Sequence, residues 1–386
     1  MGEVTPISAA RPKVLEFFAG IGLARMGLES AGFRVTWAND YEPDKKAMYV
    51  AQFGDTDDHH TFALGDIGKV KADDLPRDAS LAWASSPCTD LSLAGSRAGF
   101  AGAQSGTFWH FIKLLEELDD DRPEIAVLEN VTGLASSHGG DDLTAAIKAF
   151  NKLGYSVDVL AIDALRFVPQ SRPRLFLVGA TNPPVDTPEP NSELRPDWLQ
   201  WVFGAKDLRT HRATLPMPPA PLTEGLGDLV EDMPLSDDRW WDEDRTRAFT
   251  ESLSPTQRDR VAALRRGPGV KYRTAYRRTR NGVAVWEVRA NDVSGCLRTA
   301  RGGSSKQAVV RLGNSRLQVR WMTPREYARL MGAGDYDLTT ARTNQALFGF
   351  GDAVAVPAVT WLADNYLMPL VRGELATTRE EVAAHG

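Results

Sequence analysis

Cys88 is the first residue of this chain whose surroundings suggest chemistry. It follows an apolar run at 81–84, which predicts a buried strand, and Pro87 fixes the backbone just before it. A thiol held at the carboxyl end of a strand could serve as a nucleophile, because a thiolate is strongly nucleophilic near neutral pH. The alternative, a small buried apolar residue, is the commoner role of a lone cysteine. The other motifs have to decide between these two roles.

An acid and two arginines follow that could act on the same ligand. Glu129 comes directly after an apolar run at 124–128, so its carboxylate arrives at a neighbouring strand end. A helix-capping or surface acid is the alternative role for Glu129. Arg172 and Arg174 precede a predicted strand at 175–180, and we expect both guanidinium groups to project to one side. Paired donors of this kind suit a phosphate or a carbonyl oxygen.

The elements that would position these groups begin with a glycine turn. A predicted strand at 13–18 runs into the turn at 19–22 and then into a helical pattern at 23–31. Glycines let the backbone approach a ligand closely, and a helix N-terminus offers free N–H groups. The order of strand, glycine turn and helix favours a nucleotide-binding unit, although a tight strand-to-helix turn could use the same residues.

Acids follow two further predicted strands. Asp40 and Tyr41 come after a strand at 33–38, and Asp66 comes after a strand at 61–64. Asp40 lies about 20 residues beyond the glycine turn, the spacing at which a carboxylate binds ribose hydroxyls in doubly wound folds. We therefore predict an α/β fold with a Rossmann-like, doubly wound, mostly parallel sheet. The remaining predicted elements are helices at 107–118, 143–153, 321–331 and 354–367 and a strand at 155–162.

The composition bounds the class of protein. The chain has 386 residues, of which 42% are hydrophobic and 25% charged, as expected of a globular protein with two domains. Its two cysteines, Cys88 and Cys296, lack the spacing of metal ligands, so we expect no metal site and no disulfide. No signal peptide and no membrane-spanning stretch is predicted, and the cytoplasm is the expected location.

The composition of the sequence changes near residue 181. Prolines become frequent there and the alternation of strands and helices stops, which predicts a domain boundary. We expect a first domain at 1–180, which carries the candidate site, and a smaller, irregular domain at 181–295. A connecting block follows at 296–320, and C-terminal helices at 321–386 are expected to return to the first domain.

Positive charge gathers in the second half of the chain. Residues 256–320 contain 16 Lys or Arg against three acids, although the whole chain has a net charge of −6. Tyr272, Tyr276 and Trp286 are interleaved with these charges. The cluster predicts a surface that binds a polyanion, and a solvated basic face is the alternative. The residues expected to contact the phosphates of such a polyanion are Arg273, Arg277, Arg278, Arg280 and Arg301.

These motifs, taken in order, resemble those of the cytosine-5 DNA methyltransferases. The resemblance covers roughly two-thirds of the chain and skips a variable middle where that family carries its target-recognition region. Any one motif is weak, but the ordered set has few competitors. It comprises FFAGIG at 17–22, Asp40, GDI at 65–67, SPC at 86–88, ENV at 129–131, Gln170 with Arg172 and Arg174, RTARGG at 298–303, TPRE at 323–326 and GDAV at 351–354.

The resemblance implies S-adenosyl-L-methionine as the cofactor and a cytosine flipped out of the duplex as the substrate. Cys88 would add to carbon 6 of the base, and Glu129 would protonate or hydrogen-bond N3. Arg174, supported by Arg172, would bind the carbonyl oxygen, and a lid at 91–105 would close behind the base. The residues expected at the cofactor are Phe18, Ala19, Gly20, Ile21, Gly22, Leu23, Asp40, Tyr41, Asp66, Ile67, Pro87, Asp352, Ala353 and Val354.

Three residues depart from the family's pattern. Thr89 stands where Gln usually follows the cysteine, Ser105 stands where an Arg often occurs, and Asp352 stands where Asn is common. None of the three removes a catalytic role. Thr89 could alter hydrogen bonds in the pocket, and Ser105 could weaken one phosphate contact.

The resemblance further implies double-stranded DNA as the partner, an enzyme that is monomeric on DNA, and a nuclease or anti-phage system whose attack on host DNA the methyl groups prevent. One alternative is an RNA cytosine-5 methyltransferase with the same active-site set. A non-catalytic DNA-binding relative is another, although it would be expected to have lost the nucleophile or the acid. A Rossmann-like oxidoreductase would explain the glycine turn but not the motifs around Cys88 and Glu129.

Overall fold

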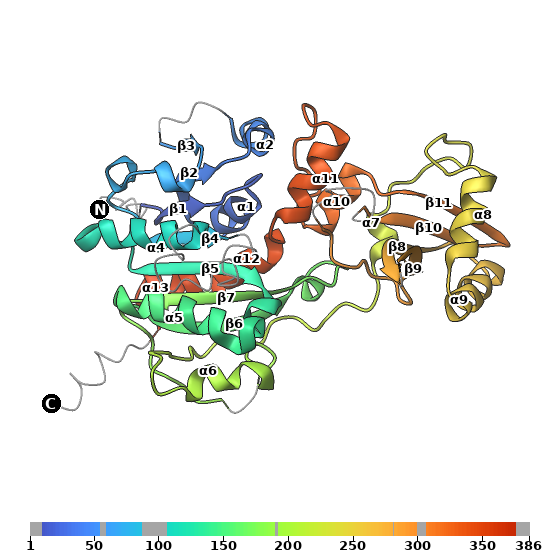
Figure 1. Cartoon of the computed structure of the whole chain (residues 1–386). Coiled ribbons are helices and arrows are strands. Elements are labelled where there is room, and N and C mark those ends of the chain that lie inside the picture. The colour runs from blue at the N-terminus through green and yellow to red at the C-terminus, as the bar shows by residue number, and fades with distance from the viewer. Residues whose placement is uncertain are drawn as a thin grey trace, which may run out of the picture.

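The computed structural model describes residues 10–54, 59–86, 106–189, 192–280, 282–298 and 306–375. They form a large α/β body and a smaller body beside it, and α10 (Pro324–Leu330) and α11 (Thr343–Asp352) lie on the side of the large body that faces the smaller one in Figure 1. Cys88, Pro87, the expected lid at 91–105 and Arg301 lie outside the described residues, as do the departures Thr89 and Ser105.

A seven-stranded sheet forms the centre of the large body. Its order is β3-β2-β1-β4-β5-β7-β6. β7 alone among these strands runs opposite to the other six, so its pairs with β5 and β6 are antiparallel. The predicted doubly wound, mostly parallel sheet is therefore confirmed. The order of strands reverses between β1 and β4, which is where such sheets bind ligands. The strands are β1 (Lys13–Phe17), β2 (Arg34–Asp40), β3 (Thr61–Leu64), β4 (Leu81–Ser85), β5 (Ile125–Val131), β6 (Ser156–Asp163) and β7 (Pro173–Ala180).

Helices cover both faces of this sheet. Alternate residues of the strands enter two separate apolar clusters, because successive side chains of a strand point to opposite faces. The first cluster packs against α1 (Leu23–Ser30), α2 (Pro43–Phe53), α10 (Pro324–Leu330), α11 (Thr343–Asp352) and α12 (Val356–Leu362). The second packs against α4 (Thr107–Glu117), α5 (Asp141–Lys152) and α6 (Gln200–Gly204).

The run from Thr343 to Val371 is long and apolar enough to cross a membrane by length and composition. It is divided into α11, α12, a π-helical turn at Ala363–Leu367 and α13 (Met368–Val371). In its most apolar stretch of 18 residues 67% are buried within the protein, and α12 packs against α1. This run is therefore a core element of the large body.

The smaller body is built on a second sheet of order β11-β10-β8-β9, antiparallel throughout. One face of this sheet packs against α8 and α9 through Phe249, Val261 and a cluster of tryptophans that includes Trp241 and Trp286. Its elements are α7 (Leu226–Leu229), α8 (Glu243–Ser252), α9 (Pro255–Arg266), β8 (Lys271–Arg280), β9 (Val283–Val288), β10 (Ala308–Gly313) and β11 (Arg316–Trp321).

The domain boundaries differ from those expected. Residues 192–213 belong to the large body, because Arg195 binds the buried Asp158 of β6 and His211 binds Ser156 and Tyr366. The expected connecting block at 296–320 instead supplies β10 and β11 to the second sheet. A proline-rich stretch indicates where regular structure stops, but it does not indicate which body the chain packs against. Strand pairing between β8 and β10 is likewise not visible in local sequence.

Candidate active site

The strand that leads to Cys88 ends beside the strand that carries Glu129. In the parallel ladder of β4 and β5, Ser85 pairs with Glu129. Asn130 then donates from Nδ2 to the carbonyl oxygen of Ser86 at 3.0 Å, and its Oδ1 accepts from the Val131 N–H. These contacts fix the point at which the chain turns toward Pro87. The sequence placed Glu129 just after the strand, whereas it lies within β5.

Glu129 and Arg174 form an ion pair on one face of the sheet. Arg174 Nε lies 3.0 Å from Glu129 Oε1, and the two side chains are 13% and 8% exposed. Arg174 Nη1 also donates to the carbonyl oxygen of Pro173. Among the described residues, Arg174 Nη2 and Glu129 Oε2 have no hydrogen-bond partner. The pair thus offers a fixed donor and a fixed acceptor at the carboxyl end of β5.

Arg172 is not hydrogen-bonded to this pair, although the charges of Arg174 and Glu129 both act on its guanidinium. Its side chain is fully buried, because the residue is only 1% exposed. Nη1 donates to Leu297 O at 2.7 Å, and Nη2 donates to Gly351 O at 3.0 Å and Ala353 O at 2.5 Å. Burial, followed by the charge of Arg174, lowers the pKa of Arg172 to about 10. Arg172 therefore clamps the backbone on both sides of Asp352 and is a positioning residue.

The glycine turn has the backbone geometry expected of a ligand cradle. Phe18, Gly20 and Gly22 have positive φ angles of 58°, 58° and 81°. A Cβ at Gly22 would lie 2.3 Å from the Phe53 ring, so only glycine fits there. Among the described residues, a Cβ at Gly20 would come within 4 Å only of the Lys45 side chain, at 4.0 Å, so these residues leave the space above Gly20 open.

Asp40 stabilises this turn from the end of β2. Its Oδ2 accepts from the Gly20 N–H and its Oδ1 from the Glu42 N–H, both at 2.9 Å. Each carboxylate oxygen has a second lone pair, so Asp40 can still accept from ribose hydroxyls. The nearby Tyr41 is 56% exposed and Leu64 is 44% exposed, as suits side chains that would flank an apolar ring.

Asp66 and Ile67 follow the end of β3. Asp66 Oδ1 accepts from the Gly68 N–H and caps the short helix at Ile67–Lys69, while Ile67 is buried. Asp66 itself is exposed, so its second oxygen faces solvent at the same edge of the sheet as Asp40. These positions agree with an adenine-binding edge.

The C-terminal helices complete the cradle. The Tyr336 hydroxyl lies 2.8 Å from Ile21 O and 3.0 Å from Met48 O, which ties the glycine turn to α2. Gly349 of α11 packs so closely that a Cβ there would lie 2.7 Å from Ile21. Leu23, Ala353 and Val354 contribute to the same apolar cluster.

The sequence analysis did not identify two residues that lie at this candidate cofactor site. Lys45 places Nζ 3.0 Å from Asp352 Oδ2, and Tyr336 makes the contacts just described. Lys45 could have been suggested by its position in the helix after Asp40, but no sequence signal pairs it with a residue some 300 positions away.

The geometry fits S-adenosyl-L-methionine. The open cradle over Gly20 can receive an amino-acid chain, the Asp40 carboxylate can accept from ribose, and the exposed Tyr41 can lie along an adenine. A group of three or more His, Cys, Asp or Glu side chains able to hold a metal ion does not occur within the part of the chain that the structure describes.

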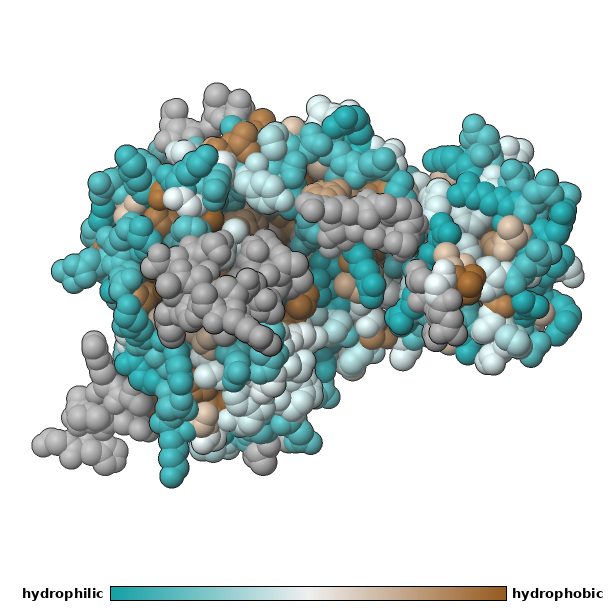
Figure 2. Space-filling model, in the orientation of Figure 1, coloured by the Kyte–Doolittle hydropathy of each residue, from teal (hydrophilic) through white to brown (hydrophobic). Residues whose placement is uncertain are grey.

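The expected DNA contacts differ in how free their side chains are. Arg273 is engaged by its own body, donating to Tyr272 O and lying 3.3 Å from Asp292. Arg278 lies 3.3 Å from Glu287, while Arg277 is exposed with its guanidinium 5.9 Å from the Trp286 ring centre. The side chain of Arg280 and all of Arg301 lie outside the described residues. Figure 2 shows a mostly hydrophilic surface over this body.

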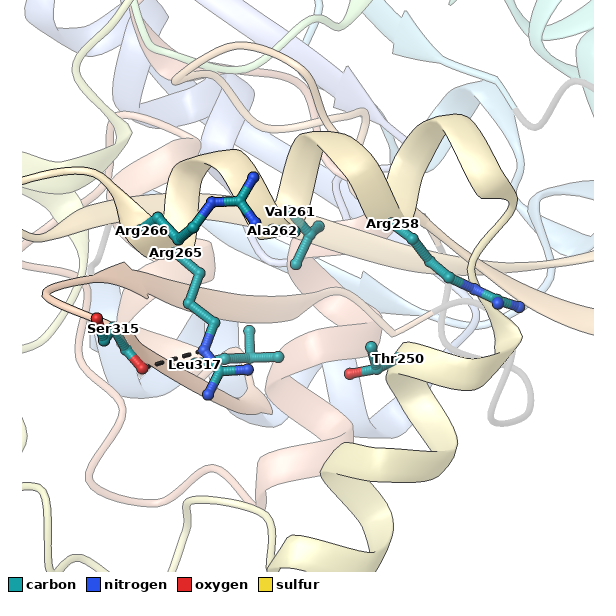
Figure 3. A pocket seen from close by; sticks show the side chains of 8 residues that line it. All are labelled: Thr250, Arg258, Val261, Ala262, Arg265, Arg266, Ser315 and Leu317. Carbon is teal, nitrogen blue, oxygen red and sulfur yellow. Dashed lines mark hydrogen bonds between the residues drawn. The ribbon is translucent and has the colours of Figure 1, made fainter.

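A pocket of about 320 Å³ lies in the second body between α9 and β11, away from the residues above (Figure 3). Its arginines serve the fold: Arg258 donates to Leu253 O and Glu251 O, and Arg265 donates to Ser315 O. The lining residues are Thr250, Arg258, Val261, Ala262, Arg265, Arg266, Ser315 and Leu317. None of them is an acid or a thiol, so the pocket lacks the groups that the predicted reaction needs.

Comparison with known proteins decides the family. The model for C-5 cytosine-specific DNA methylases matches residues 12–367, which is most of the chain. The chain belongs to the C-5 cytosine-specific DNA methylase family. It is therefore a DNA cytosine-5 methyltransferase, and enzymes of this family take their methyl group from S-adenosyl-L-methionine.

Relatives of the C-5 cytosine methylase family match over nearly the whole chain. The chain is similar to the Type II methyltransferase M.Bsp6I of Bacillus sp. (strain RFL6), with 26% identity over 92% of this chain and 98% of that protein. It is also similar to M.NgoBI of Neisseria gonorrhoeae, with 27% identity over 90% of each. The S. pombe Dnmt2 methyltransferase structure shares the fold, with a TM-score of 0.58 at 17% identity over 93% of this chain and 99% of that one.

Proposed function

We propose that the enzyme methylates a cytosine flipped out of double-stranded DNA, with Cys88 as nucleophile and Glu129 and Arg174 holding the base. The observation that carries this proposal is the pairing of Glu129 with Arg174 beside the strand end that leads to Cys88. A base entering there would meet a carboxyl group and a guanidinium on one side. Cys88 would be delivered from the adjacent strand.

The first step needs a nucleophile because carbon 5 of cytosine is too weakly nucleophilic by itself. The Cys88 thiolate bonds to carbon 6, the electron pair of the double bond between carbons 5 and 6 moves between carbons 4 and 5, and the pair between carbon 4 and N3 moves onto N3. Glu129 donates a proton or a hydrogen bond to N3 and so stabilises the charge that develops there. Arg174 Nη2 donates to the carbonyl oxygen of the base, which helps to hold the ring and to draw charge away from it.

S-adenosyl-L-methionine supplies the electrophilic methyl group when it is bound. Asp40 would hold its ribose, Tyr41 would lie along the adenine with Phe18 on its other side, and the Ile67 segment with Asp66 would contact the adenine edge. Pro87 would border the same site from the end of β4. After carbon 5 has taken the methyl group, leaving S-adenosylhomocysteine, the carbon 5 proton passes to water, the ring double bond re-forms and the Cys88 thiolate is expelled. Arg172 contributes by clamping the backbone around Asp352.

The second body is proposed to recognise the DNA sequence. Its exposed arginines on β8, foremost Arg277, support contact with the phosphate backbone. Several relatives are named Type II methyltransferases, and we propose that this enzyme likewise marks host DNA so that a partner nuclease or anti-phage system spares it. It would act as a monomer on DNA in the cytoplasm.

The test is bisulfite sequencing of DNA from cells that express the wild-type enzyme, Cys88→Ala or Glu129→Gln. We expect protected cytosines in one recurring sequence context with the wild type and none with Cys88→Ala. The variants should bind S-adenosylhomocysteine as the wild type does, because neither residue is placed at the cofactor. Protected cytosines that persist in Cys88→Ala would refute the nucleophile. Protection confined to cellular RNA would favour the RNA methyltransferase instead.

A further inference from the structure

Lys45 lies against the open space above the glycine turn. Its Cδ is the atom that a Cβ on Gly20 would meet, at 4.0 Å, so the aliphatic part of Lys45 forms one wall of the cradle. Its Nζ lies 3.0 Å from Asp352 Oδ2. The two side chains are 11% and 32% exposed, so an opposite pair of charges sits at the edge of the cofactor site.

Contacts between α2 and α11 hold this pair in place. Gln345 donates to Asp44 O at 2.8 Å, and Arg342 lies 3.1 Å from the Asp44 carboxylate. Lys45 Nζ also lies 5.3 Å from the centre of the Phe348 ring. Burial opposes the charge of Lys45, but Asp40 and Asp352 outweigh it and raise the Lys45 pKa. Lys45 is therefore a positioned cation at neutral pH.

The amino-acid end of S-adenosyl-L-methionine is a zwitterion with one carboxylate and one ammonium group. We propose that Lys45 and Asp352 bind this zwitterion, with Lys45 donating to the carboxylate and Asp352 accepting from the ammonium. An ammonium group has three donors, and Asp352 occupies one of those of Lys45. This inference rests on the proposed placement of the cofactor over Gly20.

The pair also gives a reason for the acid at position 352. The family commonly has Asn there, and an amide would leave the mostly buried Lys45 without a negative charge at 3.0 Å. Asp40 would remain as a nearby carboxylate, but burial opposes the charge of Lys45, so the second carboxylate at position 352 stabilises that charge further. Arg172 adds support by fixing the carbonyl groups of Gly351 and Ala353 on either side of the acid.

The competing explanation is that the pair only joins α2 to α11. Calorimetric titration with two ligands separates the explanations. S-adenosylhomocysteine carries the zwitterion, whereas 5′-methylthioadenosine has the same adenosine and sulfur but no amino acid. The proteins are the wild type, Lys45→Met, Asp352→Asn and the control Lys113→Met, whose lysine pairs with Glu117 on the exposed face of α4.

We expect Lys45→Met to bind S-adenosylhomocysteine about tenfold more weakly or worse, as is typical when a charge-assisted hydrogen bond is removed. Asp352→Asn should also weaken it, and neither variant should change methylthioadenosine binding by more than about twofold. Lys113→Met should match the wild type with both ligands.

Equal losses for the two ligands, or no loss for either, would overturn the inference and leave the pair as a link between helices. A Lys45→Met variant that binds neither ligand would overturn it as well. A wild-type protein that binds neither ligand would instead show that the proposed cofactor site is wrong.

Discussion

Replacement of Arg172 by methionine separates its role as a clamp from a role at the base. The methionine keeps most of the aliphatic stem but removes the donors to Leu297 O, Gly351 O and Ala353 O. A buried carbonyl without its partner costs about 1–3 kcal/mol, so three lost partners correspond to about 3–9 kcal/mol.

Part of that cost is offset. The lowering of the Arg172 pKa from 12.5 to about 10, caused by burial and then by the charge of Arg174, corresponds to a cost of about 3 kcal/mol for the charged side chain that a methionine does not incur. The net destabilisation is then about 3 kcal/mol at the centre of the range, concentrated at the backbone around Asp352. We expect a lower apparent unfolding temperature and weaker binding of S-adenosylhomocysteine.

The assay is calorimetric binding of S-adenosylhomocysteine together with thermal unfolding, and Arg174→Met is the matched control. Arg174 pairs with Glu129 near the surface of the proposed base site, so its variant should bind the ligand normally and lose methyl transfer. If Arg172→Met unfolds at the wild-type temperature and binds the ligand with wild-type affinity but has lost methyl transfer, the clamp is refuted. Arg172 would then be assigned to contact with the base.

Two further predictions concern charge. Replacement of Arg277, Arg278 and Arg280 by Ala should reduce the slope of log affinity for DNA against log salt concentration by up to about 0.9 per lost phosphate contact. A filter-binding titration measures this slope, and an unchanged slope would show that none of the three contacts the phosphates. Glu16 is buried under the glycine turn, and its pKa is raised from 4.5 to about 8, chiefly by burial. Its contribution to stability is therefore full below pH 4.5 and lost as the pH rises through about 8, so the unfolding temperature should fall more for the wild type than for Glu16→Gln between pH 6 and 9. Parallel pH profiles for the two proteins would contradict this assignment.

Local patterns in the sequence predicted the sheet of the large body well. The apolar runs at 13–18, 33–38 and 81–84 correspond to β1, β2 and β4, because buried parallel strands are continuous in hydrophobicity. Asp40 likewise lies at the end of β2, where its distance from the glycine turn placed it.

Contacts between residues far apart in the chain could not be predicted from the sequence. The carbonyl groups that accept hydrogen bonds from Arg172 lie some 125 to 181 residues away in the chain. The partner of Lys45 lies on α11, and the strands that complete the second sheet follow β9 after an irregular segment. Residue types and spacing define local geometry, whereas these pairings depend on how distant elements pack.

The two ends of the second body meet at one place. Glu231, where the chain enters that body, accepts from the Thr323 hydroxyl, and its N–H donates to Glu326 Oε1 at 2.9 Å. Arg320 completes the junction through a buried ion pair with Glu326. The second body is thus a long insertion in the chain whose first and last residues lie side by side. Lengthening such an insertion adds little to the entropic cost of closing it. Its size and surface can therefore change during evolution while the distances within the large body stay the same.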